Sequence, residues 1–310
     1  MKKTVRFALT LMMLLSMGSF VFSQGTPVTT KPNLVPTQVV PLTPVSSIQP
    51  SVNKTGGLKV PLDGSFTQVS FLPDYTGGGG FFSDDGSTAP ITSPFTFCFY
   101  GTNEPFFYIN NNGNVSFDFA LSTYTSTGFP VSGIPVLAPF WGDVDTRGGN
   151  IGSVWYKMDA HKVIVIWNAV GYYGVHGDKL NTFELIFTDG TDPILGSGNN
   201  VAFSYTTMQW TTGDASSGTG GFGGVPATVG VNKGDGIDYA LVGRFDHAGT
   251  DFDGAGGNAD GIGYLADKYY EFNACGNTVV IPPNVPISDW ALVLLGIALL
   301  GVGTLYIMKR

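Results

Sequence analysis

PVLAPFWGDVDTR, residues 135–147, is the stretch of this sequence that most strongly indicates how the chain folds. Its first half is an apolar run that ends in Phe140 and Trp141, and its second half alternates charged with uncharged residues. Such a segment buries its apolar part in a core, while its charged part either binds a ligand or is satisfied internally. We therefore expect the apolar residues to be core and the charged ones to form a compact group, Asp143, Asp145 and Arg147.

The composition around this stretch predicts an all-β protein. Of the 310 residues, 43% are hydrophobic and only 12% are charged, so the chain can bury a sizeable core. The 44 Gly and 19 Pro accompany 23 Phe and 13 Tyr, a combination of turn formers and strand formers. We expect an antiparallel sandwich or barrel-like single domain over residues 56–280. Its candidate strands are residues 66–72, 95–100, 105–109, 114–119, 154–158, 163–167, 182–188, 201–206, 227–231, 239–245 and 269–272.

The two ends of the chain predict export. Residues 1–23 have the basic start, apolar middle and small-residue end of a secretory signal peptide. Residues 24–55 are rich in Pro and Thr and predict an extended linker. Residues 290–308 are uncharged and span about 28 Å as a helix, close to the thickness of a bilayer. Because Lys309 and Arg310 follow, we expect a transmembrane helix whose basic tail stays in the cytoplasm.

A short motif precedes this apolar stretch. Together with the helix and the basic tail, it resembles the sorting signals of bacterial exosortase substrates whose motif is IPTL-x-x-W. The resemblance implies a surface protein of bacterial type, a sorting protease as partner and a cut within residues 285–310. The motif residues are Val285, Pro286, Ile287, Ser288, Asp289 and Trp290.

The charge balance excludes one class of partner. Residues 24–285 contain 10 basic and 22 acidic residues, a net charge of −12. An acidic exterior repels nucleic acids and anionic lipids. The sequence therefore favours cations and neutral or basic surfaces as partners.

The chain contains two cysteines, Cys98 and Cys275. In an exported protein an even pair of this kind favours a disulfide over a reactive thiol site. We expect the bond to join the first and last strands of the core.

Several stretches, taken in order, resemble the extracellular nidogen-like domain, called NIDO. They are residues 95–101 (FTFCFYG), 108–117 (YINNNGNVSF), 139–147 (PFWGDVDTR), 152–156 (GSVWY), 166–173 (IWNAVGYY), 181–188 (NTFELIFT), 208–214 (MQWTTGD) and 223–236 (GGVPATVGVNKGDG). The resemblance implies a secreted or cell-surface module associated with adhesion to cells and matrix, and it brings no catalytic residue set with it.

Asp143 and Asp145 lie two residues apart, so an extended strand would place both carboxylates on one side. Three interpretations are open. The pair could serve glycoside hydrolysis as acid and base, although such pairs normally come from separate elements across a cleft. It could bind a cation. It could also be structural and satisfied by Arg147 or by turn amides, which is the interpretation that we favour.

A second acidic stretch, DFDGAGGNADG at residues 251–261, concentrates oxygen ligands among glycines. Calcium prefers such ligands, in numbers of about six to eight. The spacing departs from an EF-hand, so a solvated turn is the alternative. The candidate calcium ligands are Asp251, Asp253, Asn258 and Asp260. No other cofactor is expected.

These observations together predict a surface-exposed adhesion or binding protein without catalysis. Its partners would be extracellular matrix, a cell-surface protein or a polysaccharide, and it would reside at the cell surface or outer envelope. The two alternatives are a secreted glycan-degrading enzyme that uses Asp143 and Asp145, and a structural subunit of the envelope.

Overall fold

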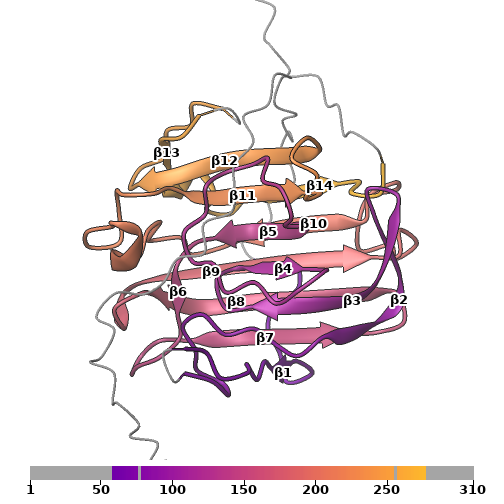
Figure 1. Ribbon diagram of the computed structural model, residues 1–310, viewed down its shortest axis with the longest axis horizontal. Helices are drawn as coiled ribbons and strands as arrows, with labels where there is room; N and C mark the ends of the chain where they lie inside the picture. Colours follow the sequence, from indigo (N-terminus) through magenta and orange to yellow (C-terminus); the bar gives the residue numbers. More distant parts are fainter. Residues whose placement is uncertain (1–57, 76–77, 255–256, 277–310) are drawn as a thin grey trace, which may run out of the picture. The chain divides into compact units, whose positions relative to one another are not determined.

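A computed structural model describes residues 58–75, 78–254 and 257–276 (Figure 1). Short strands dominate these residues, and the helices among them are two single 3-10 turns, η1 (Asp214–Ser216) and η2 (Ile262–Tyr264). The strands are β1 (Thr67–Gln68), β2 (Ile91–Phe99), β3 (Thr102–Asn110), β4 (Asn114–Ser116), β5 (Val136–Trp141), β6 (Val144–Asp145), β7 (Ser153–Met158), β8 (Lys162–Tyr172), β9 (His176–Thr188), β10 (Val201–Tyr205), β11 (Ala227–Asn232), β12 (Tyr239–His247), β13 (Asp260–Gly261) and β14 (Tyr269–Phe272).

The strands form two sheets that face one another as a sandwich. One sheet has the order β1-β7-β8-β9-β10-β14, with β6 paired to β8, and the other has the order β13-β12-β11-β5-β4-β3-β2. The pairs are antiparallel except for β12 with β13, which is parallel. The predicted all-β class is therefore confirmed for the described residues, and the sandwich alternative is the one that the chain adopts.

Aromatic side chains from both sheets fill the space between them. Phe97 and Phe107 from one sheet pack edge-on against Phe187 of β9 in the other, with ring centroids 5.0 and 5.2 Å apart. Trp167 stacks on Phe183 at 5.1 Å. Trp141, Trp167 and Trp210 are all fully buried. The large rings therefore belong to the core, as expected for most aromatics of an all-β domain.

The outer face of each sheet is also covered. Leu121, Phe129, Val131 and Ile134, from the segment between β4 and β5, pack with Trp141 on one outer face. Residues 58–66 cover the other outer face, where they lie on strands β8, β9 and β10. Because both faces of the central strands are buried, β5, β10 and β11 are buried along their whole length, whereas β2 alternates.

Strand β5 was not among the predicted strands, although the burial of its residues was expected. All six residues of Val136–Trp141 are buried in the middle of a sheet. Pro139 lacks the N–H that a central strand needs, which argues against a strand in the sequence. The structure accommodates Pro139 in a β-bulge. Trp141 pairs with Thr228 and Ala138 pairs with Gly230, so two residues of β5 lie opposite one residue of β11.

The predicted disulfide is present. Cys98, in β2, bonds to Cys275, just after β14, with the Cα atoms 4.9 Å apart. These are the edge strands of the two sheets, so the bond joins one sheet to the other. Asn200 strengthens the same junction, since its side chain donates to the Cys98 carbonyl (2.8 Å) and accepts from the Ala274 N–H (2.7 Å).

The predicted signal peptide (1–23), the predicted linker (24–55) and the predicted sorting tail (285–310) all lie outside the described residues. Within the described part of the chain, no helix has the length and apolar character needed to span a membrane.

Candidate functional site: a buried acidic cluster beside strand β6

The candidate site begins where the chain crosses from one sheet to the other. Strand β5 pairs with β4 and β11, whereas β6, two residues later, pairs with β8 in the opposite sheet. Gly142 and Asp143 form the crossing. A Cβ atom on Gly213 would lie 2.7 Å from Asp143 Oδ2, so the absence of a side chain at residue 213 makes room for this carboxylate.

A loop from early in the chain docks against this crossing. The Ser83 N–H donates to Thr146 Oγ1 (2.8 Å), and the Thr146 N–H donates to the Ser83 carbonyl (2.9 Å). Within the loop, Asp74 Oδ2 accepts from the N–H groups of Asp84 (3.3 Å) and Asp85 (3.2 Å). These bonds hold Asp84 and Asp85 in place next to strand β6.

The turn after β3 supplies the third side of the site. Asn111 Nδ2 donates to the Val144 carbonyl at 2.6 Å, and Asn112 Nδ2 donates to Asp85 Oδ1 at 2.7 Å. Gly113 completes this turn with a φ of +75°, and a Cβ atom there would lie 1.8 Å from the Phe140 carbonyl oxygen. A residue with a side chain does not fit, so the turn depends on glycine.

These three segments bring together a set that we call the acidic cluster, Asp84, Asp85 and Asp143. Each offers one carboxylate oxygen, these oxygens lie within 4.8 Å of one another, and the described residues contain no other such group. The three side chains belong to residues that are at most 1% exposed. A cluster of buried carboxylates is electrostatically costly unless cations or hydrogen-bond donors compensate it.

Asp145 belongs to a separate arrangement with Arg147. Arg147 Nε and Nη2 donate to the two carboxylate oxygens of Asp145 at 2.9 and 2.8 Å, and the Val175 N–H donates to the same carboxylate at 3.1 Å. The hydrogen bond to Asp145 raises the pKa of Arg147 above its ordinary value. Arg147 Nη2 also lies 3.4 Å from Asp84 Oδ2, so this guanidinium connects the pair to the acidic cluster.

The structure thus divides the two carboxylates that the sequence paired. Asp143 joins Asp84 and Asp85, while Asp145 joins Arg147. Sequence reasoning did not identify Asp84, Asp85 or Asn112 as site residues. The signals available for them were the acidic pair in a glycine-rich loop and the NNNG turn, and neither indicates contact with residues about 30 to 60 positions further along the chain.

The acidic loop, residues 251–260, is arranged differently. Asp260 is buried and accepts from the N–H groups of Arg244 and Asp253, both at 2.9 Å, and burial raises its pKa to about 6. Asp251 contacts His247 Nε2 at 2.9 Å near the surface, and Asn258 accepts from Arg244 Nη1 at 3.1 Å. Residues 255–256 are not described, and calcium binding by this loop stays a prediction.

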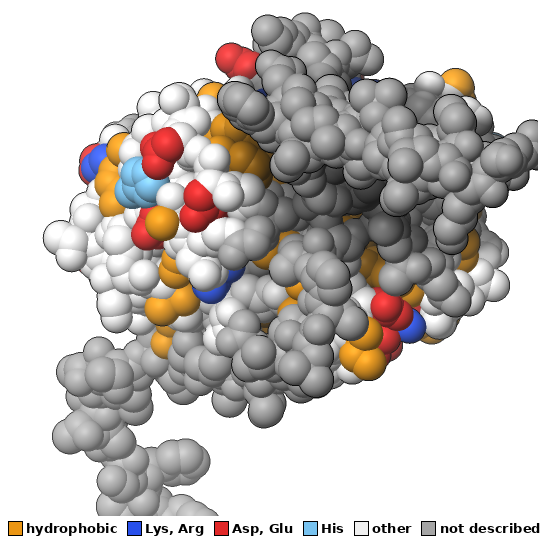
Figure 2. Space-filling model, turned by 90° about the horizontal axis from the view of Figure 1, so that it is seen from above, with side chains coloured by type: hydrophobic (Ala, Val, Ile, Leu, Met, Phe, Trp, Pro, Cys, Tyr) orange, Lys and Arg blue, Asp and Glu red, His pale blue; other side chains and the backbone are white. Residues whose placement is uncertain are grey.

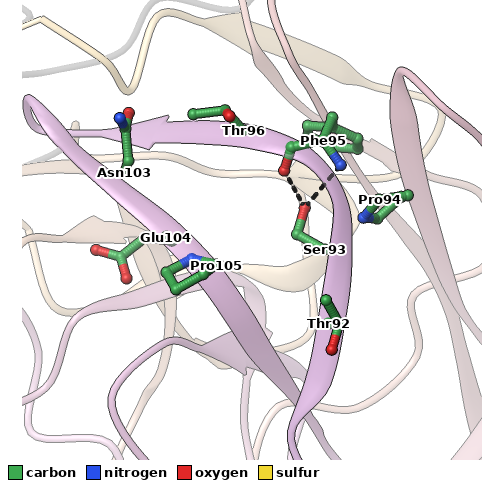
Figure 3. A pocket seen from close by; sticks show the side chains of 8 residues that line it. All are labelled: Thr92, Ser93, Pro94, Phe95, Thr96, Asn103, Glu104 and Pro105. Carbon is green, nitrogen blue, oxygen red and sulfur yellow. Dashed lines mark hydrogen bonds between the residues drawn. The ribbon is translucent and has the colours of Figure 1, made fainter.

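A concavity of about 420 Å³ lies where β2 separates from β3 (Figure 3). Thr92 pairs with Phe106 and Phe97 pairs with Glu104, so residues 93–96 arch away from the neighbouring strand. Ser93 Oγ holds the arch by donating to the Phe95 carbonyl at 2.7 Å. One carboxylate, that of Glu104, is among the lining side chains. The arch and Pro94 also interrupt the open edge of the sheet, which discourages pairing with another chain.

Comparison with known proteins finds similarity over the part of the site that contains Asn112 and Asp143. Residues 105–164 and 158–251 match the family described as Nidogen-like domain. Over 181 residues, 49% of the chain, the sequence is 33% identical to alpha-tectorin of Mus musculus and of Homo sapiens. It is 32% identical over 182 residues to alpha-tectorin of Gallus gallus. The matched part is 8% of the length of these proteins. No solved structure matches the chain.

The family match includes Asp143, Asp145 and the whole of strands β4 to β11, whereas Asp84 and Asp85 precede the matched residues. The crossing between the sheets is therefore part of the shared domain, and the loop that completes the acidic cluster comes from the segment before it. Residues 105–251 are therefore similar to nidogen-like domains.

Proposed function

We propose that this protein is a non-catalytic extracellular binding module that attaches its carrier to matrix, to a cell-surface protein or to a polysaccharide. The observation that carries the proposal is the match of residues 105–251 to the nidogen-like domain, with about a third of residues identical to alpha-tectorins. The disulfide between Cys98 and Cys275 supports an oxidising, extracellular location.

Burial of the candidate catalytic carboxylates supports a role without catalysis. Asp143 is 1% exposed and Asp145 is fully buried. A glycosidase places its acid and its base or nucleophile on either side of a bound sugar, within reach of the bond that breaks. Asp145 instead has both oxygens occupied by Arg147. These contacts make glycan degradation the less favoured of the two functions.

The described surface supplies several small contact areas. On the described part of the face in Figure 2, several acidic side chains lie around a histidine, and hydrophobic side chains form several separate groups. In the loop before the acidic cluster, Leu72, Tyr75, Phe81 and Phe82 are each about half exposed. Exposed aromatic side chains close together in a loop suit contact with a protein or with sugar rings.

We further propose that the predicted signal peptide and the tail at residues 285–310 deliver the domain to the cell surface, where a sorting protease acts on the tail. Mass spectrometry of the mature protein from cells tests this proposal. A C-terminal peptide that ends before residue 290 is expected, and a mature chain that still ends at Arg310 would instead indicate a plain anchor.

Arrays of matrix proteins, cell-surface proteins and polysaccharides, probed with the full chain, test the binding function. Saturable binding to one class is expected. The enzyme alternative requires release of reducing ends from a polysaccharide by the wild type and not by a chain with Asp143→Asn and Asp145→Asn. Ordered self-assembly without any added ligand would favour the structural envelope subunit.

A further inference from the structure

The acidic cluster has the geometry of a cation site made from distant parts of the chain. Asp84 and Asp85 come from the loop before β2, and Asp143 comes from the crossing between β5 and β6. Their three carboxylate oxygens converge within 4.8 Å although the residues are buried. Buried carboxylates that approach one another so closely repel, and a bound cation is one of the few arrangements that reverses the sign of this interaction.

Asn112 provides an independent observation at the same place. The residue is 1% exposed, and its Nδ2 donates to Asp85 Oδ1 at 2.7 Å. Its Oδ1 has no hydrogen-bond partner among the residues that the structure describes. Because Oδ1 and Nδ2 share one carbon atom, this buried oxygen also lies beside Asp85. Buried polar atoms nearly always have a partner, so this amide oxygen is available as a ligand atom beside the carboxylates.

A cavity borders the cluster at Asp85. It has a volume of about 300 Å³, and Asp74, Tyr75, Asp85 and Ser87 are among its lining residues. Ser87 is 8% exposed, and its hydroxyl also has no hydrogen-bond partner among the described residues. The cavity therefore places further side-chain oxygen atoms, such as that of Ser87, on the side of the cluster where Asp85 lies.

We propose that Asp84, Asp85 and Asp143, together with the side-chain oxygen of Asn112, bind a calcium ion. All of these ligand atoms are oxygens, which hard cations prefer, and no sulfur or imidazole takes part in the group. Calcium binds its ligands at about 2.3 to 2.6 Å, so oxygens on opposite sides of one ion lie about 5 Å apart. The observed spacing fits within that span.

The charges around the cluster favour a divalent ion. The Arg147 guanidinium lies 3.4 Å from Asp84 and is shared with Asp145, and the Tyr75 hydroxyl, which is neutral, donates to Asp85. An added double positive charge would offset most of the repulsion among Asp84, Asp85 and Asp143. Asp74 holds the two loop carboxylates in position through their N–H groups, so the ligands are already arranged before an ion binds.

Calorimetric titration of the full chain with calcium chloride, after treatment with EDTA, tests the proposal. We expect one ion per chain outside the acidic loop and an increase of about 4 °C or more in Tm at saturating calcium. Asp85→Asn should weaken binding by about tenfold or more, because one charged ligand is lost. Asp251→Asn with Asp253→Asn removes two predicted ligands of the acidic loop, so an ion bound at the cluster persists in this variant and an ion bound in the loop is lost. The matched control, Asp159→Asn, changes an aspartate that pairs with Lys162 and should leave calcium binding unchanged. Absence of binding at millimolar calcium, or unchanged binding in Asp85→Asn, overturns the proposal.

Asn112→Asp keeps the test decisive if Asp85→Asn does not fold. This change replaces an amide ligand by a carboxylate and removes the hydrogen bond to Asp85, so the protein without calcium should lose stability while calcium binding strengthens. We expect a larger calcium-induced rise in Tm than in the wild type. A rise equal to or smaller than that of the wild type, or a chain that stays unfolded with calcium, counts against the site. Magnesium chloride in the same titration should bind at least tenfold more weakly, since its smaller coordination sphere requires the carboxylates to move closer.

Discussion

The acidic cluster and the acidic loop contain the same kinds of side chain but are built in opposite ways. The loop gathers its carboxylates within ten residues, and Asp251 is exposed and paired with His247. The cluster gathers Asp84, Asp85 and Asp143 across some sixty residues and buries all three. In the acidic loop, carboxylates that are close in sequence lie largely at the surface. In the acidic cluster, distant segments bring carboxylates together in the interior, where their charge needs compensation.

The largest expected effect comes from breaking the turn that carries Asn112. In Gly113→Ala, the new Cβ would overlap the Phe140 carbonyl oxygen, and the residue would have to keep a φ of +75°. We expect a loss of about 3 to 4 kcal/mol in the free energy of unfolding, from strain plus displacement of β5. Chemical denaturation followed by tryptophan fluorescence measures it.

The acidic loop offers a matched control. Gly254 also has a positive φ, +100°, but no atom lies within 4 Å of its Cβ position. Gly254→Ala should therefore cost about 1 kcal/mol, the conformational part alone. Equal losses in the two variants would show that the turn at Gly113 is no more constrained than an exposed loop.

An intermediate effect is expected from removing the Arg147 guanidinium, which lies beside the buried carboxylates. Arg147→Met keeps much of the apolar stem but leaves Asp145 without its bidentate partner and Asp84 without its neighbouring guanidinium. Since a buried carboxylate without its partner is strongly destabilising, we expect a loss of about 2 to 3 kcal/mol in unfolding free energy at neutral pH.

In the acidic loop, the comparable change is His247→Gln, which removes exposed contacts with Asp246 and Asp251. Exposed pairs contribute little, so we expect a loss below about 0.5 kcal/mol. A loss in Arg147→Met as small as that of His247→Gln would mean that other groups neutralise the buried carboxylates.

A pH dependence within the acidic loop should be smaller than the losses expected in Gly113→Ala and Arg147→Met. Burial raises the pKa of Asp260 to about 6 in the folded chain, above its unfolded value. The folded state therefore binds a proton more readily than the unfolded state, so this group stabilises the fold as pH falls from about 7.5 to about 5. Relative to Asp260→Asn, the wild type should gain about 1 kcal/mol over this interval.

Urea denaturation of both proteins at the two pH values measures this difference. The comparison with Asp260→Asn cancels the contributions of the other carboxylates, several of which have lowered pKa values and act in the opposite direction. A wild type that loses stability relative to the variant on acidification would show that Asp260 stays ionised in the folded chain.

Much of the fold could be predicted from the sequence. Short apolar runs between turn residues predicted most of the strands, and Tyr269–Phe272 occupies the predicted residues. The prediction that the apolar residues before Asp143 are core is confirmed, since Val136, Leu137 and Trp141 are fully buried. The predicted disulfide between Cys98 and Cys275 is confirmed as well. Pro139 concealed strand β5, because the sequence does not show that a bulge absorbs a proline in a central strand.

The sequence by itself determined the all-β class, the burial of PVLAPFW and the resemblance to nidogen-like domains, because hydrophobic patterning and turn chemistry act over a few residues. Only the tertiary structure decided which carboxylates meet. Alternation along a strand placed Asp143 with Asp145, but the chain leaves β5 for the opposite sheet at Gly142 and Asp143, so Asp143 meets Asp84 and Asp85 instead. That encounter depends on the pairing of β6 with β8 and on the docking of residues 83–85 against Thr146, which are contacts between distant segments and leave no local pattern in the sequence.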